Sequence, residues 1–71
     1  MQKIYIGSLA IAASDGDYQK YLDFRNGRRG SVRVVEKSGK DHKMVLSGSG
    51  RTITLTHYYR GEIFAQDSKE I

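Results

Sequence analysis

The strongest structural signal in the sequence lies in residues 31–59, SVRVVEKSGKDHKMVLSGSGRTITLTHYY. The first part of this stretch is rich in valine, and Thr52 to Thr56 alternate strictly between polar and apolar side chains, which is typical of β-strands. Turn residues separate the runs at Gly39-Lys40 and at Ser49-Gly50. Segments of about 7–12 residues between regular turns are the spacing of an antiparallel β-meander. The stretch therefore predicts neighbouring β-hairpins.

The lengths of the turns predict how these strands pair. A two-residue loop at Gly39-Lys40 would place Val34 opposite Val45 and Glu36 opposite Lys43. The next hairpin would keep the apolar side chains of its two strands on one face of the sheet. The reverse face would be mostly polar, so it should be wetted or form an interface.

The two histidines are the candidates for acid–base or metal chemistry. A loop at Ser49-Gly50 would place His42 opposite His57, close enough to share a proton or a metal ion. Two histidines make an incomplete site, and Asp41 is the only nearby carboxylate in the sequence. The chain also has no nucleophile elbow, no phosphate-loop glycine pattern and no informative pair of carboxylates. We therefore expect no enzyme activity, no cofactor and no metal site.

The N-terminal third of the chain allows two interpretations. Asp15-Gly16 beside an alternating apolar segment is a strong hairpin signal, and it would pair Leu9 with Leu22 on a nearly apolar face. The same residues fit a helix at about 17–26 with Asp17 as its cap, because side chains recur there at helical spacing. The preferred fold is all-β, a small antiparallel meander of about five to six strands that forms a barrel or sandwich. The alternative is α+β with that one helix.

The chain is short enough to form only one small β domain, residues 1–71. Its last strand should run from Glu62 to about Gln66 and bring Phe64 near His57, and the tail 67–71 is expected to fray. Without cysteine no disulfide can reinforce the fold. A single core of this size supplies only about 3–5 kcal/mol, and such chains commonly self-associate. We therefore expect a homo-oligomer.

The N-terminus bears on localisation. Lys3 precedes an apolar run from Ile4 to Ala13 that contains the small-x-small pattern Ala10-Ile11-Ala12, as in a cleavable secretory signal. The run is short and diluted by polar residues, and cleavage would remove a well-patterned strand. No stretch approaches the roughly 18 apolar residues of a membrane span. We expect a cytoplasmic protein without a membrane span, with secretion as the alternative.

Basic residues are concentrated in the middle of the chain. The net charge is +4, but residues 25–60 hold nine basic and two acidic side chains. Arginine binds phosphate oxygens bidentately, and aromatic rings beside it can stack on bases without reading sequence. The pattern favours a surface for nucleic acid or another polyanion. The candidate phosphate-binding residues are Arg25, Arg28, Arg29, Arg33, Arg51 and Arg60, and the candidate stacking platforms are Tyr21, Tyr58 and Tyr59.

Two classes of function fit these features. The leading hypothesis is a small basic β-domain that self-associates and binds single-stranded DNA, RNA or another polyanion without catalysis, with an affinity that falls steeply with salt. The alternative is a structural or protein-interaction protein, such as a subunit of a phage or secretion assembly or an inhibitor that docks on a partner protein. It is motivated by a second apolar face, larger than a wetted sheet face needs, formed by Ile6, Val32, Val34 and Val45.

The general plan of the chain is similar to that of the tryptophan-regulated RNA-binding attenuation proteins, which are short, ring-forming all-β oligomers. The similarity rests on Asp15-Gly16 after an apolar strand, on Arg29-Gly30-Ser31-Val32 opening another, and on Arg60-Gly61-Glu62 before a charged tail. That family binds RNA with Lys-x-Arg-Gly on one strand, whereas the corresponding stretch here, Leu46 to Gly50, has no basic residue. The resemblance therefore implies neither a ligand nor binding residues for this chain.

Overall fold

The computed structural model describes the chain from Met1 to Ile71 as one helix and six strands. All strand pairs are antiparallel, in a two-stranded sheet of β1 and β2 and a four-stranded sheet in the order β3-β4-β5-β6. The elements are β1 (Gln2–Ile6), β2 (Leu9–Ala13), α1 (Asp15–Arg25), β3 (Ser31–Ser38), β4 (His42–Ser49), β5 (Thr52–Tyr59) and β6 (Glu62–Glu70).

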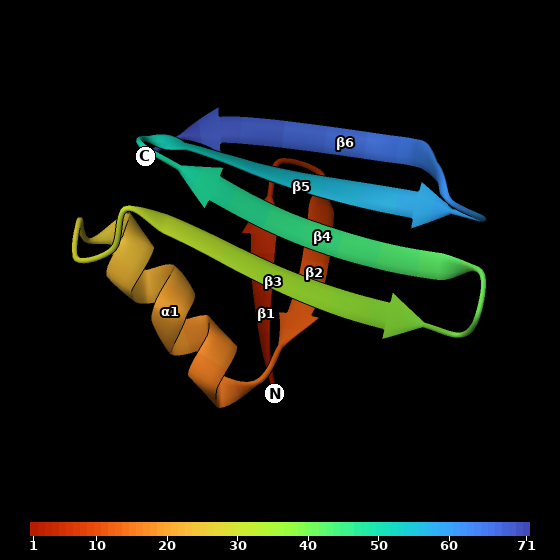
Figure 1. Ribbon diagram of the computed structural model, residues 1–71, viewed down its shortest axis with the longest axis horizontal. Coiled ribbons are helices and arrows are strands. Elements are labelled where there is room, and N and C mark those ends of the chain that lie inside the picture. Colours follow the sequence, from red (N-terminus) through yellow and green to blue (C-terminus); the bar gives the residue numbers. More distant parts are fainter.

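The two sheets form two layers that cross each other steeply (Figure 1). The β1–β2 hairpin lies behind the larger sheet in this view, and α1 lies beside β3. The prediction of a small, mostly antiparallel β fold is confirmed, but β3 and β6 remain open edges, so the sheet does not close into a barrel. The one helix, α1, is not long and apolar enough to cross a membrane.

The hydrophobic core lies between the large sheet and the layer made of the hairpin and α1. We call the side of β3–β6 that faces this layer the inner face, and the opposite side the outer face. Burying one large aliphatic side chain contributes about 1.5–3 kcal/mol. The six largest fully buried side chains are Ile4, Ile6, Ile11, Leu46, Ile53 and Leu55.

The predicted second apolar face does not exist as a free surface. Ile6, Val32 and Val34 are all buried in the core, because the β1–β2 hairpin covers the inner face. Of the four residues, only Val45 lies on the outer face, where it is half-buried opposite Val35. The expected exposed apolar face, which was the reason to consider a protein-interaction function, is therefore wrong for three of its four residues.

The hairpin predicted at Asp15-Gly16 is wrong, and the alternative helix is correct, although it begins at Asp15 and its cap is Ser14, not Asp17. The Ser14 hydroxyl accepts a hydrogen bond from the backbone N–H of Asp17 at 3.2 Å and caps the helix N-terminus. Carboxylates in the first turn and Arg25 in the last turn complement the helix dipole. The apolar strand that precedes α1 pairs with β1 instead, with Ile4 opposite Ile11. Helix capping and an available partner strand therefore overrode the local turn signal.

The predicted register of β3 and β4 is wrong by one residue. The loop contains Gly39, Lys40 and Asp41, so Val34 lies opposite Leu46 rather than Val45. A slip of one residue moves every side chain of a strand to the other face. The observed register puts Val34 and Leu46 together in the core, whereas the predicted one would have paired an inner with an outer residue. Core burial thus selects the longer loop.

The register of β4 and β5 differs from the prediction by two residues. The loop is Gly50-Arg51, so Leu46 lies opposite Leu55. A shift of two keeps every side chain on its predicted face, because strand side chains alternate with period two. The predicted assignment of faces for these strands is therefore confirmed, although the directly paired residues differ.

Strand β6 is longer and less regular than predicted. It continues beyond Gln66 to Glu70, which lies opposite Thr52, and the backbone N–H of Ile71 donates to the carbonyl of Arg51 at 2.9 Å. A bulge interrupts the register between His57 and Tyr58. Residues 67–70 are thus part of the sheet.

Gly48 sets how closely α1 approaches the sheet. It lies in β4, and a Cβ there would be 2.8 Å from ring atoms of Phe24 and 2.9 Å from Cγ1 of Val32. A side chain would therefore push the end of the helix away from the inner face. The missing side chain lets Phe24 bury its ring and fixes the position of Arg25 and the loop that follows.

Candidate nucleic-acid interface

The outer face is open and carries cations but almost no carboxylates. Strand alternation places Arg33, Lys37 and Lys43 on it, and β3, β4 and β5 contribute no acidic side chain to it. Two carboxylates of the sheet point inward and hold the hairpin instead. Glu36 accepts from the backbone N–H of Ala12 at 3.3 Å, and Asp67 accepts from that of Ser8 at 3.1 Å. The two sides of the sheet therefore differ in charge.

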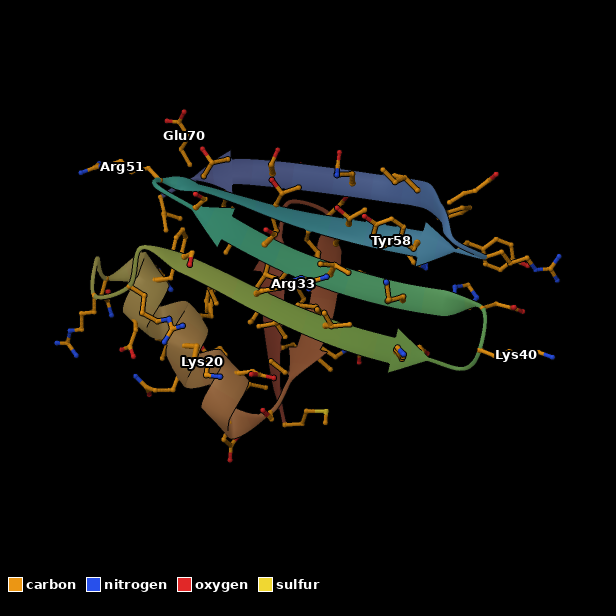
Figure 2. All side chains as sticks on the ribbon, in the orientation of Figure 1. Lys20, Arg33, Lys40, Arg51, Tyr58 and Glu70 are labelled. Carbon is orange, nitrogen blue, oxygen red and sulfur yellow. The ribbon has the colours of Figure 1, made fainter.

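The labelled side chains in Figure 2 show how the basic residues are distributed along this side. Arg33 lies over the middle of the sheet, Arg51 at one end, and Tyr58 and Lys40 toward the other. Glu70 lies near Arg51 at the edge formed by β6. The cations therefore extend from one end of the outer face to the other.

A hollow of about 680 Å³ opens at the end where the β3–β4 and β5–β6 loops meet. We call it the loop-end hollow. The N–H of Arg60 donates to the carbonyl of Asp41 at 2.8 Å, which ties the two loops together. The side chains of the same two residues approach to 3.9 Å, but both are solvent-exposed, so this ion pair contributes little. The charged and aromatic lining residues are Lys37, Lys40, Asp41, His42, Lys43, Tyr58 and Arg60.

A second hollow lies at the opposite end of the sheet, and we call it the helix-end hollow. Its lining combines the end of α1, the loop after it and the β4–β5 turn, and it includes no acidic side chain. Arg29 is held in place by a hydrogen bond from its Nε to the carbonyl of Ser31 at 3.3 Å. The cations of this hollow are Arg25, Arg29 and Arg51.

The structure brings together some of the predicted residues and separates others. Arg25, Arg29 and Arg51 meet in the helix-end hollow, although the last of them is far away in sequence. Arg28 lies in the same loop but does not line the hollow, and Arg33 lies between the two ends. Arg60 belongs to the loop-end hollow. The six arginines therefore form an elongated distribution and not one cluster.

The three tyrosines predicted as stacking platforms lie in different environments. Tyr21 is 6% exposed and packs in the core, so its ring is not available to a base. Tyr58 lies on the outer face and lines the loop-end hollow, with the Lys43 ammonium 5.3 Å from its ring centroid. Tyr59 lies on the inner face opposite His42. Only Tyr58 combines an aromatic ring with the basic outer face.

Sequence reasoning missed Lys37 and Lys43, which lie directly opposite each other on the outer face. The signal that could have revealed them is the register, because the predicted pairing put Glu36 opposite Lys43. Like charges directly opposite each other destabilise a sheet. A pair of this kind next to a hollow marks a place where an anion would relieve the repulsion.

On the inner face, beyond the edge of the hairpin, four rings form a surface that we call the aromatic–imidazole patch: His42, His57, Tyr59 and Phe64. The His42 Nδ1 and His57 Nε2 atoms are 3.0 Å apart, so one ring donates a hydrogen bond to the other. The ring centroids of His57 and Phe64 are 5.2 Å apart. The expected closeness of the histidines to each other and to Phe64 is confirmed, although His42 pairs with Tyr59 across the strands. No group of three or more potential metal ligands surrounds them.

Comparison of the chain with known protein families, with curated proteins and with solved structures gives no match. Functional inference therefore rests on the chemistry of the residues themselves.

Proposed function

We propose that this protein binds single-stranded nucleic acid, or another extended polyanion, along its outer face without catalysing a reaction. The observation that carries the proposal is the lack of internal neutralisation. Arg60 is the only Lys or Arg side chain within 4.0 Å of a carboxylate, and even that contact is long and exposed. Cations without partners on one open side are available to phosphate groups.

An extended ligand fits the spacing of the cations better than a compact one. The two hollows lie at opposite ends of a molecule whose longest dimension is 34 Å, and Arg33 lies between them. A small anion could engage only one hollow at a time, whereas a flexible chain of phosphates could engage both ends and the middle together. OB folds, which are also small β domains, cover roughly 4–16 nucleotides of a single strand.

Fluorescence anisotropy with a labelled single-stranded oligonucleotide, a duplex of the same length and heparin tests the proposal. We expect binding at low salt, with the logarithm of the affinity falling linearly as the logarithm of the salt concentration rises, by about 0.7 per phosphate contacted on a single strand. The double variant Lys3→Gln/Lys69→Gln is the control, because Lys3 lies on the hairpin and Lys69 on the inner face. It should bind like the natural chain. Absence of binding to all three polyanions at low salt would refute the proposal.

A second candidate function is self-association through the aromatic–imidazole patch, and a specific observation favours it. The side chain of Phe64 is 71% exposed, and Tyr59, whose ring centroid lies 6.4 Å from that of Phe64, is 36% exposed. Large exposed apolar side chains that gather at one place mark interaction surfaces. Only 13 of the 71 residues are buried, so an additional interface would add substantially to the stability of the chain.

The charges around the patch favour a second copy of the same chain as the occupant. The rim holds Asp41 and Glu62 together with Arg60, whose guanidinium lies 5.3 Å from the Tyr59 ring centroid. In a two-fold symmetric contact the same patch meets itself, and a rim with both signs of charge can then pair with its copy.

Sedimentation at increasing protein concentration tests this second candidate. We expect the natural chain to dimerise and Phe64→Ser to remain monomeric, because the substitution removes the most exposed ring without touching the core. Val35→Ser is the matched control, since Val35 is 43% exposed but lies on the outer face. A natural chain that stays monomeric throughout, or equal effects of the two variants, would contradict a role for the patch.

A further inference from the structure

The pairing of Lys37 with Lys43 needs a physical explanation. The two residues are direct cross-strand neighbours, which brings their Cβ atoms to about 4.5–5.5 Å from each other. No carboxylate of β3, β4 or β5 shares their face, and neither lysine forms an ion pair. Tyr58, on the other side of Lys43, offers its ring to that ammonium but not to Lys37. Two positive charges are therefore held side by side on rigid strands without internal compensation.

The neighbouring turn adds another cation in an unusual conformation. Arg60 has a φ of +52°, in the left-handed region that Gly, Asn and Asp adopt more readily, and Gly61 follows with a φ of +82°. Two consecutive positive φ values are typical of a type I′ hairpin turn, whose first position seldom holds arginine. The hydrogen bond from the Arg60 N–H to the carbonyl of Asp41 fixes this turn against the β3–β4 loop. The fold thus fixes the backbone of Arg60 at the edge of the loop-end hollow, while its exposed guanidinium, 5.3 Å from the Tyr59 ring centroid, is free to turn toward a ligand there.

We infer that the loop-end hollow is a binding site for a phosphate group. Lys37 and Lys43 would hold the phosphate oxygens from the sheet, and Lys40 and Arg60 would approach from the two loops. A phosphate accepts several charge-assisted hydrogen bonds at once, so it can satisfy donors that converge from different elements. Asp41 is the only carboxylate in the lining, so the four cations retain a strong positive excess.

The size and walls of the hollow indicate that the phosphate belongs to a larger molecule. About 680 Å³ lies within the range of small-molecule binding sites. The ring of Tyr58 forms part of the wall next to Lys43, where it can contact a group attached to the phosphate. A nucleic acid and a free phosphorylated molecule share this chemistry. The inference rests on the proposed function only in naming nucleic acid as one source of the phosphate.

The test is an NMR titration of the ¹⁵N-labelled full chain with four ligands in separate experiments: inorganic phosphate, pyrophosphate, a thymidine 12-mer, and the same 12-mer with a 5′-phosphate. We expect amide shifts at residues 37–43 and 58–61 for each ligand that binds. In the double variant Lys37→Gln/Lys43→Gln these shifts should disappear and the affinity should fall about tenfold or more. In Lys3→Gln/Lys69→Gln the shifts and the affinity should remain those of the natural chain.

The outcomes separate this inference from the proposed function. If the 12-mer binds but shifts only the amides around the helix-end hollow, and phosphate and pyrophosphate leave the loop-end amides unshifted, the phosphate site is refuted and the proposed function survives. If phosphate and pyrophosphate shift the loop-end amides while the 12-mer does not bind, the site stands and the ligand is a free phosphorylated molecule. Equal loss of affinity in both double variants would mean that overall charge alone attracts phosphate, which also refutes the site.

Discussion

The two ends of the large sheet both offer cations, but they are built from different residues on different supports. The helix-end hollow gathers three arginines from the end of α1, an irregular loop and a turn. The loop-end hollow has two lysines on paired strands, with a third lysine and an arginine on the two loops. Loops adapt to a ligand, whereas strand residues keep a fixed spacing. If the protein binds a polyanion as proposed, we expect the helix end to supply general attraction and the loop end to supply a defined position for a phosphate group.

The largest expected effect concerns the helix end. The variant Arg29→Gln/Arg51→Gln should weaken binding of a single-stranded oligonucleotide about 100-fold, because two charge-assisted contacts of about 1.5 kcal/mol each are lost. The slope of log affinity against log salt should fall by about 1.4. Anisotropy titrations at several salt concentrations measure both quantities. If Lys37→Gln/Lys43→Gln lowers the slope of log affinity against log salt by more than this variant does, the helix end is not the main source of electrostatic attraction.

Gly48→Ala would disturb the packing of α1 on the sheet, which positions the helix-end hollow. A methyl group there would meet the Phe24 ring, so we expect a loss of about 1–3 kcal/mol in the free energy of unfolding, measured by urea denaturation. Amides around Arg25 and Arg29 should shift, while those of the loop-end hollow keep their positions. Gly30→Ala is the control, because nothing lies within 4 Å of a Cβ at that position. Equal costs for the two substitutions would mean that the close approach of Phe24 is unimportant.

Removal of the helix cap tests how far the helix end depends on α1 itself. Ser14→Ala loses the hydrogen bond to the Asp17 N–H and should cost about 1 kcal/mol in the free energy of unfolding. Ser47→Ala, on the exposed outer face, should change it by less than about 0.5 kcal/mol. Thermal unfolding followed by circular dichroism compares the two. A neutral result for Ser14→Ala would show that packing, and not capping, fixes the helix.

The smallest expected effect has the opposite sign and belongs to the loop end. Lys37→Gln should raise the free energy of unfolding by about 0.2–1 kcal/mol at low salt, because it removes the repulsion across the strands. The gain should shrink as salt screens the charges. Lys69→Gln is the control, since its cross-strand neighbour is Ile53. A destabilised Lys37→Gln chain would show that this lysine stabilises the free fold.

Much of the fold follows from the sequence, because alternation and turn residues act locally. The pattern from Val32 to Tyr59 predicts the correct faces for β4 and β5. The helical spacing in the N-terminal third indicates α1 as the alternative to a hairpin. The start of α1 was obscured because Asp15-Gly16 fits both a turn and the first turn of a helix. Only the presence of β1 as a partner for the preceding strand, a contact between distant parts of the chain, decides between them.

The candidate site was predicted less well, because it depends on register and on loops. One extra loop residue, Asp41, turns an expected neighbour pair of Glu36 and Lys43 into the observed pair of Lys37 and Lys43. The convergence of Arg51 with Arg25 and Arg29 depends on how α1 packs against the sheet, which no local pattern encodes. Tyr21 was misjudged for the same reason, since packing against the core, and not its sequence neighbours, determines its exposure.

The bulge in β6 has a consequence for how copies of this protein can meet. An open sheet edge can pair with strands of further copies, and repeated pairing of this kind produces fibrils. The bulge between His57 and Tyr58 kinks the edge strand, and the charged side chains of Asp67, Lys69 and Glu70 follow on the straighter half. An incoming backbone therefore finds no long, flat, uncharged template along this edge. The chain can therefore expose aromatic rings at this end of the molecule while the β6 edge beside them disfavours addition of further strands.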